Sequence, residues 1–242
     1  MKIITAYQEF KDFRNSIESV SFVPTMGNLH NGHMALIDKA KSYDSHVVAS
    51  IFINPLQFND ASDFKNYPKS IDDDIAILSE HGCDSLFIPD SSILEDIEEI
   101  KAPDKALYLC GMNRPGHFDG VLTIVNKLFE IIKPSRSFFG KKDFQQLTLI
   151  SNFVKENNLP IEIISVDTVR EQNGLAMSSR NNRLSESDRE KASKLYKTLN
   201  VIKENSYNLS YELINKHKDE LIQQGFVVDY LSACSPDSLK NL

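Results

Sequence analysis

Two histidines three residues apart, His30 and His33, give the segment Pro24–Ile37 (PTMGNLHNGHMALI) its chemical interest. The segment follows an apolar run that predicts a strand, and it leads into a helix that begins near Gly32. A helix start presents unpaired N–H groups and a positive dipole end, which suit a nucleotide phosphate. Two imidazole donors there would stabilise charge that builds on an α-phosphate under attack and on departing pyrophosphate. The strand, turn and helix setting favours this over a turn with two incidental histidines.

Neutral amides follow the next predicted strand. In Ser50–Asn59 (SIFINPLQFN), Asn54 and Gln57 flank Pro55. A carboxamide offers both a donor and an acceptor, so it suits a ligand that carries hydroxyl and carboxylate groups. On this segment alone, an Asn-Pro turn with an exposed glutamine is the simpler explanation.

A glycine-containing turn opens the segment Arg114–Pro134 (RPGHFDGVLTIVNKLFEIIKP), most of which is an apolar core helix. Arg114 and His117 lie in the turn, where a substrate carboxylate or phosphate could meet them. Surface charge explains either residue equally well.

Two more segments combine charge with turn residues. In Phe139–Leu147 (FGKKDFQQL), Lys141 or Lys142 could reach a phosphate as a point charge, although lysines at helix starts are usually solvated. Val169–Ser185 (VREQNGLAMSSRNNRLS) combines hydroxyls with Arg180. Such a loop can close over a triphosphate, or it can be an ordinary polar linker.

The elements that must position these residues alternate between strand and helix. Short β-branched runs predict strands, and apolar residues at three- and four-residue spacing predict helices between them. The strands are expected at Lys2–Thr5, Ser21–Pro24, His46–Ile53, Ser85–Ile88, Ser137–Phe139 and Ile161–Val166. The helices are expected at Met34–Tyr43, Ile71–His81, Val121–Ile132 and Phe144–Asn157. This pattern is typical of an open parallel α/β sheet, which binds ligands beyond the carboxyl ends of its strands.

The sequence becomes more polar after residue 168. Polar helical sequence, Ser185–Asn205 and Tyr211–Gln224, is followed by an alternating run, Phe226–Ala233. We therefore expect a first domain over residues 1–168 and a smaller α+β domain over residues 169–242. The acidic stretch Ser91–Lys105 has no clear period and is expected to be a surface excursion.

Composition excludes several classes of protein. With 41% hydrophobic and 25% charged residues over 242 positions, the chain has the composition of a globular protein. A net charge of −7 offers no broad basic surface for nucleic acid. No apolar run approaches the roughly 18 to 20 residues of a membrane span, so a cytoplasmic protein is expected. Cys83, Cys110 and Cys234 form no CxxC pair, which argues against a disulfide framework and a zinc site.

Taken together, the segments HNGH, SIFINPLQF, RPGHF, FGKKDFQQ and GLAMSSRN resemble the pantothenate synthetase family of the HxGH nucleotidyltransferase superfamily. The resemblance covers most of the chain and implies a Rossmann-like domain, a shortened C-terminal lid domain and a homodimer. It implies that ATP activates pantoate as pantoyl adenylate with release of pyrophosphate, and that β-alanine then displaces AMP. Mg²⁺ would accompany ATP.

The resemblance also implies roles for individual residues. His33 would be catalytic, with His30 and Lys142 assisting. The ATP site would comprise Met26, Gly27, Asn28, Leu29, His30, Asn31, Gly32, His33, Gly140, Lys141, Lys142, Asp143, Val169, Met177, Ser178, Ser179 and Arg180. Gln57, Gln146 and Asn54 would bind pantoate, and Gln57 would also lie near β-alanine. Asp73 or Asp74 would lie near the metal.

Three other functions remain open at this point. An HxGH adenylyltransferase acting on a phosphorylated acceptor would need a second basic cluster beyond Arg114, Lys141, Lys142 and Arg180. A tRNA-charging enzyme would need a basic surface for RNA, which the acidic balance opposes. A nucleotide-binding module without catalytic activity would bind ATP but release no pyrophosphate.

Overall fold

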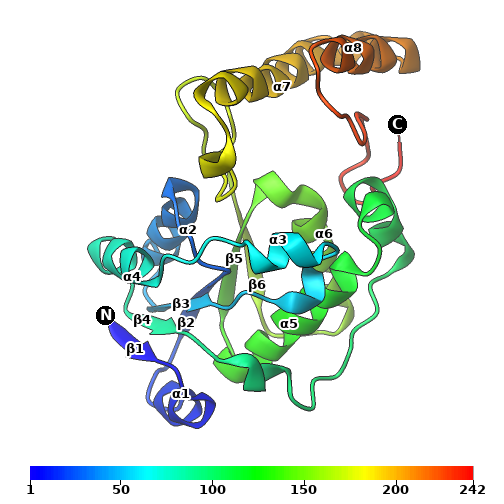
Figure 1. The fold of residues 1–242 in the computed structure, drawn as a ribbon. Coiled ribbons are helices and arrows are strands. Elements are labelled where there is room, and N and C mark those ends of the chain that lie inside the picture. Colours follow the sequence, from blue (N-terminus) through cyan, green and yellow to red (C-terminus); the bar gives the residue numbers. More distant parts are fainter. Residues whose placement is uncertain (242) are drawn as a thin grey trace.

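The computed structural model describes residues 1–241 and contains a six-stranded parallel sheet in the order β1-β4-β3-β2-β5-β6 (Figure 1). The strands are β1 (Lys2–Ile4), β2 (Val20–Thr25), β3 (His46–Ile51), β4 (Ser85–Phe87), β5 (Arg136–Gly140) and β6 (Glu162–Val166). All six expected strands are confirmed, with ends that differ by one or two residues. The Rossmann-like α/β fold is confirmed with them.

The strand order reverses between β2 and β5. From β2 the chain proceeds outward through β3 and β4, and after β5 it proceeds to β6 on the other side. β2 pairs with β3 along its whole length, whereas it pairs with β5 only at Ser21 with Arg136 and at Phe22 with Ser137. The two central strands therefore part beyond Phe22, and they leave a crevice at the switch point where such folds bind ligands.

Helices cover both faces of the sheet. The helices of this part are α1 (Tyr7–Arg14), α2 (Asn31–Lys41), α3 (Ala61–Lys65), α4 (Ile71–Glu80), α5 (His117–Ile132) and α6 (Phe144–Glu156). α2 and α4 pack on one face, and α1, α5 and α6 pack on the other. The four expected helices are confirmed; α1 and α3 were not foreseen, because they are short and bury only Phe10 between them.

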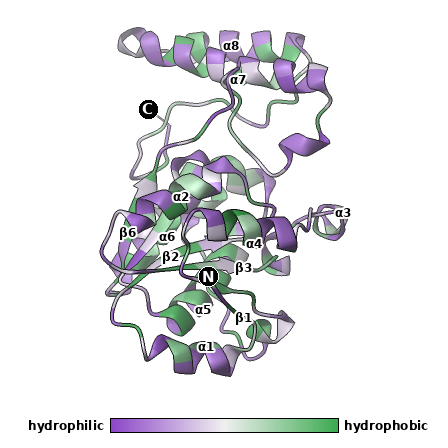
Figure 2. Cartoon of the chain, turned by 90° about the vertical axis from the view of Figure 1, so that its left-hand side faces the viewer, coloured by the Kyte–Doolittle hydropathy of each residue, from purple (hydrophilic) through white to green (hydrophobic). Residues whose placement is uncertain are grey.

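Two hydrophobic clusters fill the space between the sheet and these helices. Phe22 and Val48 point to the α5 side, and Val23 and Val47 point to the α2 side. The central strands are thus buried on both faces, as parallel strands in an α/β protein should be. Figure 2 shows the hydrophobic residues gathered along the strands and α5. The stretch expected as a surface excursion is partly core, since Ile93 is 5% exposed.

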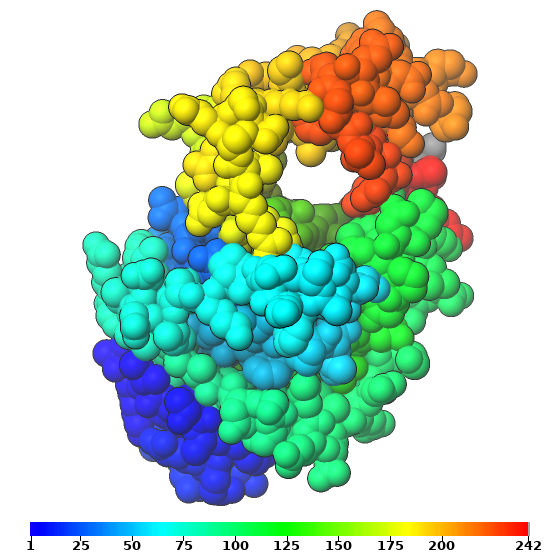
Figure 3. Space-filling view, in the orientation of Figure 1, coloured from blue at the N-terminus to red at the C-terminus, as the bar shows by residue number. Residues whose placement is uncertain are grey.

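The C-terminal part consists of α7 (Glu186–Glu204) and α8 (Tyr211–Gln223), which lie together beyond the carboxyl edge of the sheet. Figure 3 shows an opening between this helix pair and the sheet domain. The strand expected from the alternating run Phe226–Ala233 is wrong. Within the described residues the run forms no strand, because no neighbouring strand is available to pair with it. Its Val227 side chain is 97% exposed. The pairing nearby is an isolated bridge between Cys234 and Asn241. Among residues 1–241, no helix is long and apolar enough to cross a membrane.

Candidate active site

A cavity of about 270 Å³ lies in the crevice between the parted strands. It extends to the loop of residues 169–185 that leads to α7, which we call the junction loop. Most of the residues expected from the sequence line it. They are Met26, His30, Gly32, His33, Asn54, Gln57, Gly140, Lys142, Asp143, Gln146, Val169, Met177, Ser178, Ser179 and Arg180. The cavity thus joins segments that are far apart in the chain but that all follow the carboxyl ends of strands or form the junction loop.

His30 and His33 are held together by the start of α2. The N–H of Gly32 donates to Nδ1 of His30 (3.1 Å), and the N–H of His30 donates to Nδ1 of His33 (3.3 Å). The ring centroids are 4.1 Å apart. A Cβ on residue 32 would lie 2.8 Å from the His30 ring, so glycine between the histidines is required for this arrangement.

These hydrogen bonds define what the two rings can offer a ligand. Because each Nδ1 accepts from a backbone N–H, the proton of the neutral ring resides on Nε2. Burial lowers the pKa of His33 to about 3, with further lowering by His30 and Lys142, and burial and Lys142 lower the pKa of His30. Both rings are therefore neutral N–H donors near pH 7, and they keep that form next to a cationic lysine.

The turn before the histidines is fixed from behind by Asp74 of α4. Its two carboxylate oxygens accept from the N–H groups of Asn28 (2.8 Å) and Leu29 (2.7 Å), and Ser70 also donates to it. Asp74 is 2% exposed. The Gly27–Leu29 turn consequently lies beneath the cavity wall and outside its lining, and it supports the histidines from there.

The carboxylates expected near a metal do not fit that role. Asp74 uses both oxygens on the backbone of the turn, and Asp73 is exposed and lies outside the cavity lining. In the described part of the chain, no group of three or more His, Cys, Asp or Glu side chains could hold a metal ion. The structure therefore does not bring Asp73 and Asp74 to the site.

The two lysines after β5 separate in space. Lys142 lines the cavity near the histidines, whereas Lys141 lies outside the lining and pairs with Asp167 at 2.6 Å. Asn31 is exposed and also lies outside the lining. Of the charged residues at this strand end, Lys142 is thus the cation that faces the histidines.

The amide of Asn54 is committed to the protein. Its Nδ2 donates to Oε1 of Gln57 (3.1 Å) and to the carbonyl of Gly120 (3.0 Å), and its Oδ1 accepts from the N–H of Leu56 (3.2 Å). A Cβ on residue 120 would lie 2.2 Å from the Leu56 carbonyl oxygen, so α5 can approach this turn only with glycine there. Asn54 therefore orients Gln57, which lines the cavity and whose Nε2 makes no hydrogen bond within the described residues.

Two neighbouring glutamines on α6 have opposite roles. Gln145 is buried, and its amide bonds to the backbone of Cys110, Lys105 and Tyr108. Gln146 lines the cavity and makes no side-chain hydrogen bond within the described residues. The two side chains point in different directions, and Gln146 is the one available to a ligand.

Arg114 and His117 also line the cavity. His117 is 6% exposed, and its Nδ1 lies 2.7 Å from the carbonyl oxygen of Gln57, which Arg114 approaches at 3.4 Å. Burial lowers the pKa of His117 to about 4. The sequence allowed either a surface charge or a ligand contact for His117. Its burial in the cavity lining excludes a simple surface charge.

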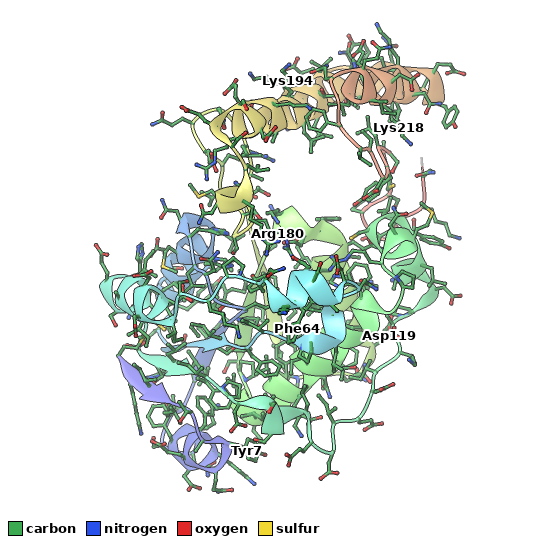
Figure 4. All side chains as sticks on the ribbon, in the orientation of Figure 1. Tyr7, Phe64, Asp119, Arg180, Lys194 and Lys218 are labelled. Carbon is green, nitrogen blue, oxygen red and sulfur yellow. The ribbon has the colours of Figure 1, made fainter. Side chains whose placement is uncertain are left out.

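The junction loop is attached to the sheet domain at two places. The hydroxyl of Ser179 donates to the carbonyl of Asn28 (2.9 Å), and Nδ2 of Asn28 donates to the carbonyl of Ser179 (3.1 Å). Arg180 and Arg183 both pair with Asp63 of α3, at 2.8 and 2.9 Å. Figure 4 shows Arg180 where the junction loop meets the sheet domain, on the side that carries Phe64 of α3. The pairing with the arginines lowers the pKa of Asp63.

Sequence reasoning missed several residues of the site. Asp167 and Thr168 follow β6, and Phe52 follows β3, so their position at carboxyl ends of strands was a usable signal. Tyr67 lines the cavity with its ring 5.7 Å from the Arg180 guanidinium, and no local pattern marks it. Val121, Ile124, Val125 and Leu128 of α5 form an apolar wall of the cavity, and Phe138 and Phe139 of β5 also line it.

A switch-point crevice with paired histidine donors, a lysine and an arginine defines a nucleotide-binding α/β protein. Comparison with known proteins makes the class specific, because the sequence profile of the family described as Pantoate-beta-alanine ligase matches residues 2–242. The pantothenate synthetase of Acinetobacter baylyi is 43% identical over 231 residues, which cover 93% of this chain and 82% of the relative. That of Neisseria meningitidis serogroup B is 42% identical over 247 residues, which cover 99% of this chain and 89% of the relative.

Two solved structures are similar to this chain along most of its length. A pantothenate synthetase from Thermus thermophilus superposes with a TM-score of 0.92 at 38% identity, covering all of this chain and 90% of that one. A pantoate-beta-alanine ligase from Francisella tularensis, complexed with beta-gamma ATP and beta-alanine, gives 0.81 at 41% identity and covers 90% and 85%. The chain belongs to the pantoate-beta-alanine ligase family.

Proposed function

We propose that this chain condenses pantoate with β-alanine at the expense of ATP, and that it forms pantoyl adenylate and pyrophosphate on the way to pantothenate and AMP. The observation that carries the proposal is the pair of neutral imidazole N–H donors, His30 and His33, beside Lys142 in the same cavity as the amides of Gln57 and Gln146. The first group suits phosphates, and the second suits a hydroxy acid.

In the first half-reaction, a carboxylate oxygen of pantoate attacks the α-phosphorus of ATP, and the bond to the β-phosphate oxygen breaks. Charge increases on the α-phosphate oxygens and on the departing pyrophosphate. The Nε2–H groups of His30 and His33 are fixed donors for that charge, and Lys142 and Arg180 line the same cavity as cations. Because the histidines are positioned by the backbone before ATP binds, no reorientation is needed during the reaction.

The pantoate end of the cavity combines amides with an apolar wall. Nε2 of Gln57 and the amide of Gln146 can bond hydroxyl and carboxylate groups without a strong electric field. Val121, Ile124 and Val125 of α5 provide an apolar surface for the two methyl groups of pantoate. This combination supports pantoate over a phosphorylated acceptor, which would bring its own charge.

In the second half-reaction, the amine of β-alanine attacks the adenylate carbonyl carbon, and AMP leaves. Residues 177–180 of the junction loop line the cavity, which supports this order, because a mixed anhydride must be protected from water. We propose that residues 1–168 form the substrate-binding domain and residues 169–242 form the lid. A homodimer belongs to the same proposal and rests on the resemblance; sedimentation of the purified chain tests it.

Magnesium enters this proposal with the substrate. The described carboxylates do not form a protein site for it, so we propose that Mg²⁺ is carried by the ATP phosphates. No residue of the chain is assigned to it.

The test is to incubate the protein with ATP and pantoate in the absence of β-alanine. The expected result is pyrophosphate in an amount equal to the enzyme, with pantoyl adenylate bound, followed by pantothenate and AMP when β-alanine is added. Pyrophosphate release without pantoate, or none with it, would contradict the proposal. A nucleotide-binding module without catalytic activity would give the second result.

A further inference from the structure

His117 presents a different ring nitrogen to the cavity than the other two histidines do. A carbonyl oxygen can only accept, so Nδ1 of His117 must donate its proton to the carbonyl of Gln57. The neutral ring then carries an unshared electron pair on Nε2. His30 and His33 have the opposite tautomer, with the proton on Nε2.

Nε2 of His117 is also unoccupied by the protein. It makes no hydrogen bond within residues 1–241, and it is not among the side-chain atoms that are buried without a partner. The ring as a whole is 6% exposed and lines the cavity. The small accessible part of the ring therefore includes an acceptor that faces the space for substrate.

The position of that acceptor relates it to both substrates. His117 is bonded to the backbone of Gln57, whose side chain lies in the proposed pantoate pocket. Asp143 and Arg180 line the same cavity and affect the pKa of His117. An amine that approached the adenylate carbonyl from this side would meet Nε2.

We infer that His117 is a catalytic residue of the second half-reaction, in which its Nε2 accepts a proton from the attacking amine of β-alanine. This inference rests on the proposed function and adds a step to it. The acidic groups in the cavity lining suit the task less well, because Asp143 pairs with Lys142 at 3.5 Å and Asp167 pairs with Lys141 at 2.6 Å.

The step balances without another reactant. β-Alanine first loses one ammonium proton to solvent, and the free amine forms a C–N bond to the adenylate carbonyl carbon. The nitrogen of the tetrahedral adduct is then cationic and passes a proton to Nε2. The C–O bond to the phosphate breaks with its electron pair on AMP, and the imidazolium returns its proton to solvent.

The surroundings keep this acceptor in its active form. Burial, with smaller contributions from Arg114 and Arg180, lowers the pKa of His117 to about 4, although Gln57 and Asp143 act in the opposite direction. The imidazole is therefore unprotonated at neutral pH and does not retain the proton it receives. The cationic adduct is a stronger acid than an alkylammonium ion, so transfer to such a weak base is feasible.

The substitution His117→Asn separates this role from a structural one. The asparagine amide can reproduce the Nδ1–H donation to the Gln57 carbonyl, but it removes Nε2. Preformed pantoyl adenylate is mixed with β-alanine in a single turnover, and pantoate adenylation is measured separately as pyrophosphate release. His81→Asn, a histidine beyond the end of α4 and outside the cavity lining, is the matched control.

We expect His117→Asn to slow the β-alanine step about 100-fold, the lower end of what general base catalysis contributes, and to leave adenylation within about twofold of the native protein. Added imidazole should restore part of the rate in His117→Gly.

A native rate for the β-alanine step in His117→Asn would overturn the inference, and so would equal slowing of both half-reactions. If His117→Asn does not fold, the same comparison is made with His117→Gln, for which equal slowing of both steps again counts against the inference. A native protein unable to convert the adenylate would instead contradict the proposed function.

Discussion

Asn28 and Ser179 exchange two hydrogen bonds although 151 residues separate them in the chain. Asn28 belongs to the turn before the paired histidines, and Ser179 belongs to the junction loop. Asn28 has a φ of +50°, and Asp74 holds its N–H from the other side. The position of the loop over the cavity is thereby coupled to the turn that supports His30 and His33.

Ser179→Ala should weaken this coupling. Loss of one neutral hydrogen bond is worth about 1 kcal/mol, so we expect adenylate formation to slow about fivefold while the folded structure is retained. Rapid-quench measurement of pyrophosphate release checks the rate. Ser206→Ala, an exposed serine after α7, should match the native rate. Equal rates in both variants would mean that the loop is positioned by its other contacts.

His30→Ala and His33→Ala should each slow adenylate formation by about 10² to 10³, because each removes one preorganised donor to developing charge. ATP binding should be affected less than the rate. Single-turnover kinetics with saturating ATP and pantoate measure the step. If either variant formed adenylate as fast as the native protein, that ring would have no role in the reaction.

Lys142→Ala should affect the first half-reaction more than the second. A lysine near the histidines neutralises triphosphate charge, and it has less to do once pyrophosphate has gone. Supplying pantoyl adenylate and β-alanine should therefore largely restore turnover. Lys141→Ala should slow the first half-reaction less, since Lys141 lies outside the cavity lining and its ammonium pairs with Asp167. Failure of the adenylate to rescue Lys142→Ala would assign the lysine to a structural role.

Gln146→Ala should reduce discrimination for the hydroxyl groups of pantoate. The native protein should use a deoxy analogue about tenfold less well or worse, because the analogue leaves a buried hydrogen-bonding group unpaired. Relative kcat/KM for pantoate and the analogue is measured in both proteins. Gln145→Ala should instead lower stability, since that amide holds residues 105–110. An unchanged ratio in Gln146→Ala would place this glutamine outside the pantoate pocket.

Acid should destabilise the protein through His33. Its pKa is about 3 in the folded state, against an ordinary value of 6.5, so well above pH 6.5 the ring is neutral in both states. Between pH 6.5 and pH 3, His33 binds a proton in the unfolded chain but not in the folded chain. The free energy of unfolding then falls by up to about 1.4 kcal/mol per pH unit from this residue. The fall in the free energy of unfolding between pH 6.5 and pH 5, measured with urea, should be about 1.6 kcal/mol smaller in His33→Gln. Comparing slopes cancels any constant packing loss, and equal slopes would contradict the assignment.

The sheet and the main site segments could be predicted because their signals are local. The run Val47–Ala49 is apolar, and the glycine and histidine types at the α2 start indicate a candidate phosphate-binding turn without knowledge of the rest. The alternation in Phe226–Ala233 is equally local, but a strand also needs a partner, and the described chain offers none there.

The roles of Asn54 and Asp74 could not be predicted, because their hydrogen-bond partners are also distant in the chain. An amide beside a proline and a carboxylate at a helix start look free in the sequence. Asn54 is used by Gly120, 66 residues away, and Asp74 is used by Asn28, 46 residues away. Only the folded chain shows that these groups are already bonded and that they position the residues around them.

The two arginines on Asp63 have a further consequence for nucleotide binding. The Asp63 carboxylate pairs with Arg180 and Arg183 in the folded chain, so the junction loop is positioned by the protein's own contacts, and ATP would not have to order it. If Arg180 binds a phosphate of ATP, as we propose, nucleotide binding exchanges one anion for another at Arg180, while Arg183 can keep Asp63 neutralised. Asp63 would then compete with ATP for Arg180, which lowers the affinity for ATP in return for a site that is assembled in advance.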